Sequence, residues 1–336
     1  MDLKLLLKRG ALLAAANWPI IAIQFVAETT LQVLLAVPVV CAAILVAVLM
    51  GGDLSELLRG SVREIFTTIA STLMSEPVAL VAFVTAFGMV LLGGSVLMFL
   101  VKGGTMDVLI AADEAAGPIE REPLTLETFR QASRFTMPGF TAGCSRLFRR
   151  YLGLGLLLML VYAVSIGAYL AFVVYGYRAA GDRVLIIGWT FIAALAAVLL
   201  VVWITFINFA YLLLQLAMAH DGVGLADACR AVTRFVRADV RPLAGVFLIV
   251  VALVAIAFLA SALAWSGVGL IAFVPLVGLA VVPLQLAAWV IRGLVFEYLG
   301  LTALGAYLAL YRGYAGRRPE AVNQPRLASS PLGNPA

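Results

Sequence analysis

The sequence predicts an all-α polytopic membrane protein, a helical bundle of about six transmembrane helices in three hairpins with amphipathic cytoplasmic helices. Of its 336 residues, 64% are hydrophobic and only 12% are charged, whereas soluble domains are about 45–50% apolar and about 25% charged. The chain also contains runs of about 20 apolar residues, long enough to cross roughly 30 Å of hydrocarbon. Such runs must be helical, because the bilayer core offers no water to the backbone groups.

The predicted membrane domain covers residues 31–311. Its six spans are expected near residues 31–50, 79–101, 151–177, 184–207, 243–265 and 270–291. The apolar stretch 294–310 follows the last of them, and the sequence leaves open whether it also crosses the membrane. Residues 312–336, rich in Pro, Ser and Asn, are expected to form a disordered cytoplasmic tail.

Residues 1–30 carry a polar stripe ahead of the first span. Asn17, Gln24, Glu28 and Gln32 follow one another at spacings of seven, four and four, which places them on one helical face. This pattern predicts an amphipathic helix at the cytoplasmic interface, anchored by Trp18 and a basic N-terminus. The alternatives are a signal peptide and a seventh crossing over residues 11–27.

The distribution of basic residues predicts the orientation. Nineteen of the 23 Arg and Lys residues lie before residue 31, within 102–150, within 219–242 or after residue 291. Only Arg59, Arg63, Arg178 and Arg183 lie in the loops of the other side. Because basic loops remain cytoplasmic, both termini should be cytoplasmic. An excess of Arg over Lys together with abundant Ala suggests a bacterial source, so we expect a multi-pass protein of the bacterial inner membrane.

An internal repeat recurs at an offset of 100 residues. The segment 127–135 (ETFRQASRF) matches 227–235 (DACRAVTRF), with three identical and two conservatively replaced positions. Each copy precedes a basic run and a pair of apolar spans. The pattern favours three helical hairpins separated by amphipathic cytoplasmic helices.

The segment 225–241, with Asp227, Arg230, Arg234, Arg237 and Arg241, resembles the short amphipathic helix that precedes membrane spans in a group of bacterial six-helix proteins. The group includes the membrane domain attached to some glycerophosphodiester phosphodiesterases, Yip-family-like proteins and uncharacterised families. The similarity covers about residues 80–310. In that group the phosphodiesterase activity belongs to a separate soluble domain, for which we expect no room in this chain. The resemblance therefore implies a fold and no reaction.

Arginines gather next to the spans on the predicted cytoplasmic side. Glu127, Arg130 and Arg134 share a helical face, as do Asp227, Arg230 and Arg234. One interpretation is a set of intrahelical ion pairs. The other is a surface that binds lipid phosphate through guanidinium groups. The candidate contacts with lipid or a partner are Arg130, Arg134, Arg146, Arg149, Arg150, Arg230, Arg234, Arg237 and Arg241.

Three charges, Glu28, Arg292 and Glu297, are candidates for the interior of the bundle. A charge at the centre of a bilayer helix costs about 2.5–3.5 kcal/mol on insertion scales, so it is usually paired or functional. Arg292 ends a span and can extend its head group toward the interface. For Glu297 we expect an ion pair with Arg292 or with an arginine of a neighbouring repeat. A transport or proton-relay role is the alternative.

Motifs that carry enzyme chemistry are not found in the sequence. Cys41, Cys144 and Cys229 lie far apart without a C-x-x-C pair, and His220 is the only histidine. We therefore expect no catalytic residue, no metal and no cofactor. The net charge of +5 follows from membrane topology, so no nucleic-acid partner is expected.

These observations favour a non-enzymatic membrane protein, a scaffold or accessory subunit. Its basic cytoplasmic face would contact anionic lipid head groups or a membrane protein partner. The alternative is a transporter or channel for a small solute or lipid, with Glu28, Arg292 and Glu297 inside it.

Overall fold

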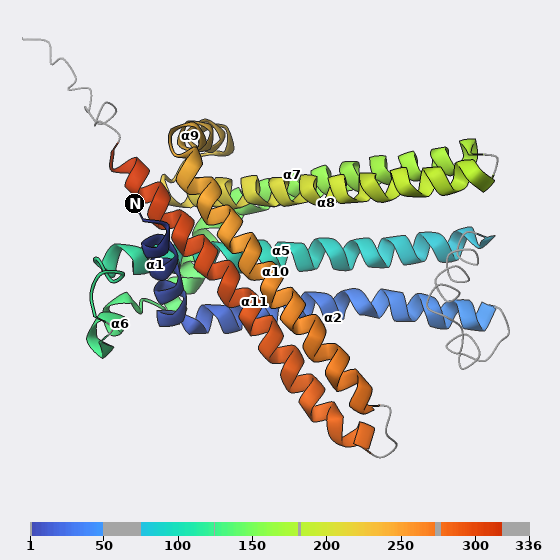
Figure 1. Cartoon of the computed structure of the whole chain (residues 1–336), viewed down its shortest axis with the longest axis horizontal. Coiled ribbons are helices and arrows are strands. Elements are labelled where there is room, and N and C mark those ends of the chain that lie inside the picture. The colour runs from blue at the N-terminus through green and yellow to red at the C-terminus, as the bar shows by residue number, and fades with distance from the viewer. Residues whose placement is uncertain (1, 50–74, 124, 181–182, 273–276, 318–336) are drawn as a thin grey trace, which may run out of the picture.

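The computed structural model describes residues 2–49, 75–123, 125–180, 183–272 and 277–317, and these residues form helices without a strand (Figure 1). The predicted all-α class is thereby confirmed. The nine described helices are α1 (Leu3–Ala16), α2 (Trp18–Leu49), α5 (Pro77–Ala115), α6 (Leu126–Ala132), α7 (Met137–Ala179), α8 (Arg183–His220), α9 (Leu225–Ala238), α10 (Val240–Ala272) and α11 (Val277–Ala315).

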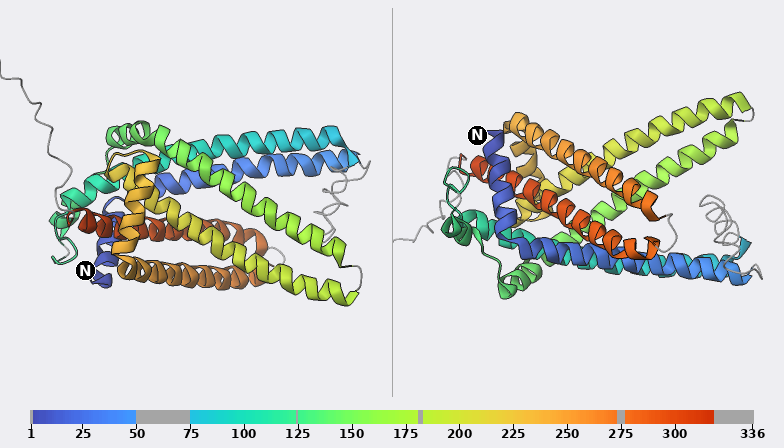
Figure 2. Two further views of the ribbon diagram at one scale, coloured as in Figure 1. Left: turned by 90° about the horizontal axis from the view of Figure 1, so that it is seen from above. Right: turned by 60° about the horizontal axis from the view of Figure 1, so that its bottom comes forward.

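Six of the described helices, α2, α5, α7, α8, α10 and α11, are long and apolar enough to cross a bilayer. Helix α2 packs against α5, α7 against α8 and α10 against α11, and α5 also packs extensively against α7. All six start or end at a common region where α1, α6 and α9 also lie, and the α10–α11 pair leans away from the others (Figures 1 and 2). The chain is therefore an integral, multi-pass membrane protein.

Most of the buried side chains lie in that common region, which we call the packed end. It comprises α1, α6, α9 and the adjoining parts of α5, α7, α8 and α11. Its largest fully buried side chains include Tyr151, Phe235, Tyr307 and Tyr311. Farther along the spans the apolar side chains are exposed, for example Val164 at 63%. Lipid chains solvate such surfaces as well as other apolar side chains do, so the spans need little contact with one another.

The first thirty residues differ from the predicted single interfacial segment. The helix breaks at Asn17, which ends α1, and α2 then continues without interruption from Trp18 to Leu49. Asn17 and Gln24 are buried, so their part of the polar stripe faces protein, while Glu28 and Gln32 are exposed. A polar stripe on a helix is compatible both with burial against protein and with a position at the membrane interface. Buried amide side chains such as Asn17 and Gln24 find hydrogen-bond partners within the protein.

Close backbone approach joins α1 to α11. A Cβ atom added at Gly10 would lie 2.2 Å from the carbonyl oxygen of Thr302, and one added at Gly305 would lie 2.9 Å from the Cα of Gly10. Only glycine fits at such a contact. Small residues at membrane-helix interfaces allow this kind of approach, and here it places α1 along the last turns of α11.

The predicted spans lie within longer helices. The stretches 79–101, 151–177, 184–207 and 243–265 are contained in α5, α7, α8 and α10, and each helix continues into the packed end. The stretch 31–49 belongs to α2, which begins earlier than predicted.

The last span differs most from its prediction. Residues 270–272 still belong to α10, and residues 277–291 form one helix with 294–310 in α11. The candidate span of this helix is Pro283–Ala315. Helix α11 also includes residues 312–315, which were predicted to belong to the tail. Residues 318–336 of that tail and the loop with Arg59 and Arg63 lie outside the described residues.

The two segments of the predicted repeat, 127–135 and 227–235, each lie at a short helix that precedes a span. The first forms α6 before α7, and the second forms α9 before α10. Helix α6 begins with a capping box between Thr125 and Thr128 and ends at Ala132. Helix α9 continues to Ala238 and buries Ala228, Ala231, Val232 and Phe235 on one face.

Candidate functional site

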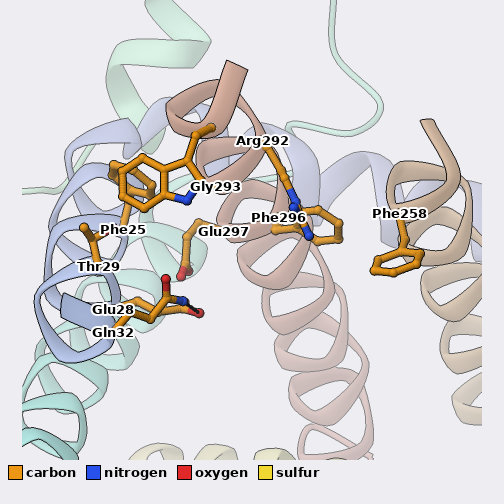
Figure 3. A pocket seen from close by; sticks show the side chains of 10 residues that line it. Phe25, Glu28, Thr29, Gln32, Phe258, Arg292, Gly293, Phe296 and Glu297 are labelled. Carbon is orange, nitrogen blue, oxygen red and sulfur yellow. Dashed lines mark hydrogen bonds between the residues drawn. The ribbon is translucent and has the colours of Figure 1, made fainter. Parts of the chain in front are cut away.

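The three predicted interior charges meet at one pocket. Glu28 comes from α2, while Arg292 and Glu297 come from α11 (Figure 3). The pocket has a volume of about 390 Å³ and is lined by Phe25, Glu28, Thr29, Gln32, Phe258, Trp289, Arg292, Gly293, Phe296 and Glu297. Helices distant in sequence therefore bring two carboxylates and a guanidinium to the same cavity.

Glu297 faces Glu28 instead of an arginine. Figure 3 shows the two carboxyl groups pointing toward one another, and they interact directly. The guanidinium of Arg292 lies over the ring of Phe296, 5.7 Å from its centroid. Five residues correspond to about 140° around a helix, so Arg292 and Glu297 leave α11 in different directions. The predicted ion pair between Glu297 and an arginine does not occur within the described residues.

A lysine supplies the nearest positive charge behind the carboxylates. Lys102 on α5 interacts electrostatically with both Glu28 and Glu297. Its Nζ lies 5.4 Å from the ring centroid of Tyr211, a distance at which an aromatic face attracts a cation. The sequence gives no signal for this arrangement, because Lys102 follows an apolar span like an ordinary topological lysine.

The pocket lies where apolar stretches end. Residues 79–101 precede Lys102, residues 277–291 precede Arg292, and the apolar part of α2 follows Gln32. From Glu28 to the end of α2 there are 21 residues, or about 31 Å of helix, which equals the thickness of the hydrocarbon core. Glu28, Lys102 and Arg292 therefore lie where apolar stretches of these helices end.

An apolar groove adjoins the pocket. It has a volume of about 370 Å³ and lies between α10 and α11. Its lining consists of Ala257, Ala260, Ser261, Ala264, Ala288, Trp289, Ile291, Arg292, Val295 and Phe296. Trp289, Arg292 and Phe296 line both cavities, so the polar pocket continues into the apolar groove.

A second charged cluster is buried at the packed end. The guanidinium of Arg9 donates to Asp113 Oδ1 at 2.6 Å, to Glu120 Oε2 at 2.8 Å and to the carbonyl oxygen of Gly117 at 2.6 Å. Arg312 from α11 donates to the other carboxylate oxygen of Asp113 at 3.0 Å. Asp113 is only 1% exposed. One carboxylate therefore joins α1, α5 and α11.

The pKa of Arg9 reflects this environment. Burial alone lowers it, but the negative charges of Asp113 and Glu120 outweigh that effect and raise the pKa above its ordinary value. Arg9 is thus charged at every pH that proteins experience. The sequence indicates only a topological role for the basic N-terminus that contains Arg9. The cluster was missed because the residues that pair in it are up to 199 positions apart in the sequence.

Asn17 forms a further link within the packed end. Its Nδ2 donates to the carbonyl oxygens of Leu13 and Ala132, at 3.0 and 2.9 Å. Its Oδ1 accepts from the backbone N–H groups of Arg134 and Phe135. The Asn17 side chain therefore binds the end of α1 to the segment between α6 and α7. Asn17 is fully buried, and these four hydrogen bonds satisfy its amide group.

All nine arginines predicted to contact lipid or a partner are exposed. Arg230 forms the expected pair with Asp227, at 3.2 Å, and Arg146 pairs with Asp107 of α5. The expected pairs of Glu127 with Arg130 and Arg134 are not among the ion pairs of the described residues. Arg134 lies beyond the end of α6, so it does not continue that helical face.

His220 takes part in a contact between helices, and the cysteines form no disulfide. His220 Nδ1 lies 2.8 Å from Asp221 Oδ1, and Tyr311 donates to the other oxygen of Asp221 at 2.6 Å. These contacts attach the end of α8 to α11. The thiols of Cys41, Cys144 and Cys229 are free.

Comparison of the chain with protein-family models, curated proteins and solved structures finds no match in any of the three. The similarity of residues 80–310 to the six-helix group therefore stays a prediction. The argument for function accordingly depends on the charges, cavities and contacts described above.

The buried cluster predicts a large effect of Asp113→Asn on stability. The substitution leaves two guanidinium groups facing a neutral amide, and breaking a buried ion pair on one side costs about 3–5 kcal/mol. We expect a clear decrease in the denaturant midpoint of the purified protein in mixed micelles. Glu114→Gln is the matched control, because Glu114 is exposed on the same turn and should change stability by less than about 0.5 kcal/mol. Equal midpoints for the two variants would contradict a stabilising role of Asp113.

Proposed function

We propose that the protein is a non-enzymatic membrane scaffold or accessory subunit that binds anionic lipid through the arginines of its packed end. The packed end would face the cytoplasm of a bacterial cell, with both termini on that side. A membrane protein partner with acidic loops would use the same surface.

The observation that carries this proposal is a surplus of exposed positive charge. Two of the nine candidate arginines form ion pairs, Arg146 and Arg230. The other seven have no ion pair with a described residue. The carboxylates of Asp113 and Glu120 are buried and occupied by Arg9 and Arg312. Two acids of the packed end are therefore occupied internally, while the nine candidate arginines are exposed.

Helix α9 presents part of this surplus beside a span. Its apolar face is buried through Ala228, Val232 and Phe235, while Arg230, Arg234 and Arg237 are exposed. Arg241 follows in the first turn of α10. Guanidinium groups bind phosphate oxygens bidentately, and each basic residue beside an anionic membrane contributes about 1 kcal/mol. Such an arrangement suits contact with anionic head groups.

Neutralising the arginines around α9 should release anionic lipid. We expect the quadruple variant R230Q/R234Q/R237Q/R241Q, extracted in native nanodiscs, to lose at least about tenfold of its enrichment in anionic phospholipid over the bulk membrane. Lipid analysis of the purified particles measures this. The matched variant with lysine at the same four positions keeps the charge and should retain most of the enrichment. Unchanged enrichment in the glutamine variant would refute the lipid-binding surface.

A second candidate function is a transporter of a small solute or lipid. The observation that favours it is the pocket with Glu28 and Glu297, because ionisable groups that line a cavity within membrane helices often mark a substrate path.

Leaflet exchange of a fluorescent phosphatidylethanolamine in proteoliposomes distinguishes a lipid transporter from a scaffold. A lipid transporter accelerates the exchange over protein-free vesicles and loses the acceleration on Glu297→Gln, whereas Glu127→Gln on α6 leaves it unchanged. A scaffold gives the rate of protein-free vesicles in all three cases.

A further inference from the structure

We infer that the polar pocket and the adjoining apolar groove bind one phospholipid whose zwitterionic head group carries a primary amine. Glu28 and Glu297 would accept the ammonium group, Arg292 would bind the phosphate, and an acyl chain would occupy the α10–α11 groove. This site is separate from the arginine surface proposed above and does not depend on it.

The order of the groups along α11 matches the order of groups in a phospholipid. The groove is lined by Ala288 and Ile291, Arg292 lines both cavities, and Glu297 lines only the polar pocket. From the far end of the α10–α11 pair toward the packed end, the sequence of environments is therefore apolar, cationic and anionic. A phospholipid presents its acyl chain, phosphate and amine in the same order.

The charges around the pocket match a zwitterion. The two carboxylates of Glu28 and Glu297 are opposed by Arg292 in the pocket and by Lys102 behind it. These four groups sum to no net charge when ionised, but the positive and negative groups lie apart. With both carboxylates ionised beside a bound ammonium group, an anionic head group would add an uncompensated negative charge, whereas a zwitterion adds none.

The carboxylates also favour a primary amine over a quaternary one. A primary ammonium group has three N–H donors, and hydrogen bonds between charged groups are the strong ones. A trimethylammonium group has no donor. Phe25 and Trp289 border the same pocket, with ring centroids 5.8 Å apart, and provide aromatic surface that attracts a cation of either type.

The position in the membrane is the one that a phospholipid needs. Glu28 and Gln32 are exposed on α2, at the level where the apolar parts of the spans end. The groove extends from there along α10 from Ala257 to Ala264, in the direction of the hydrocarbon. Its small side chains leave room between α10 and α11 for an acyl chain.

The test is a competition among phospholipids with identical acyl chains, carried out by native mass spectrometry on the delipidated full-length protein in detergent. We expect phosphatidylethanolamine to bind about tenfold more tightly than phosphatidylcholine or phosphatidylglycerol, because the preference comes from hydrogen bonds to charged groups. The double variant E28Q/E297Q should bind phosphatidylethanolamine no more tightly than it binds phosphatidylcholine. Glu127→Gln on α6 is the control with the same substitution outside the site, and should retain the wild-type preference.

A second variant tests the apolar half without changing a charge. Ala260→Phe fills the groove and should weaken all three phospholipids by a similar factor while leaving their order unchanged. If the double variant does not purify as a monodisperse protein, the wild-type competition and Ala260→Phe still test the site.

Equal binding of the three phospholipids by the wild-type protein would overturn the proposal, and so would a preference for phosphatidylglycerol. A wild-type preference that survives in a monodisperse E28Q/E297Q variant would overturn it as well. The glutamine quadruple on α9 and α10 distinguishes this site from the arginine surface, because it should retain the preference for phosphatidylethanolamine even where it loses anionic lipid.

Discussion

The rest of the structure depends on the ion pairs that the buried carboxylate of Asp113 forms with Arg9 and Arg312. This carboxylate joins the first helix, the end of α5 and the end of α11, and Glu120 adds a second acceptor for Arg9. Buried charges are costly unless each is paired and hydrogen-bonded. Here the protein meets that condition at one end of the bundle, and α1 lies against α11 because Gly10 and Gly305 allow their backbones to approach.

The pocket follows from this arrangement. Its two carboxylates stand on α2 and α11, and both helices are positioned by the packed end. Asn17 determines where α2 begins, and Arg312 attaches α11 to α5. Beyond the packed end the helix pairs diverge (Figure 2), and lipid takes the place of protein contacts. A charged pocket between diverging helices is therefore accessible to membrane lipid from the side.

The apolar runs predicted an all-α protein with six helices long and apolar enough to span a membrane, because the lipid-exposed surface of such a helix must be apolar. They also located Glu28, Arg292 and Glu297 as exceptions within that pattern. The sequence did not reveal their partners. Helical geometry separates Arg292 from Glu297, and Glu28 reaches Glu297 only through tertiary contacts. The buried roles of Asn17, Asp113 and Arg9 were missed for the same reason, since a polar residue near a span has the same pattern whether it faces water or protein.

Hydrogen exchange of the α1 backbone, measured by mass spectrometry on the protein in nanodiscs, tests the central claim most directly. If α1 belongs to the packed end, peptides covering residues 3–16 exchange as slowly as those covering 301–311, and Asp113→Asn accelerates both. If α1 instead lies free at the membrane surface, residues 3–16 exchange much faster than 301–311 and do not respond to the substitution. That result would contradict the account.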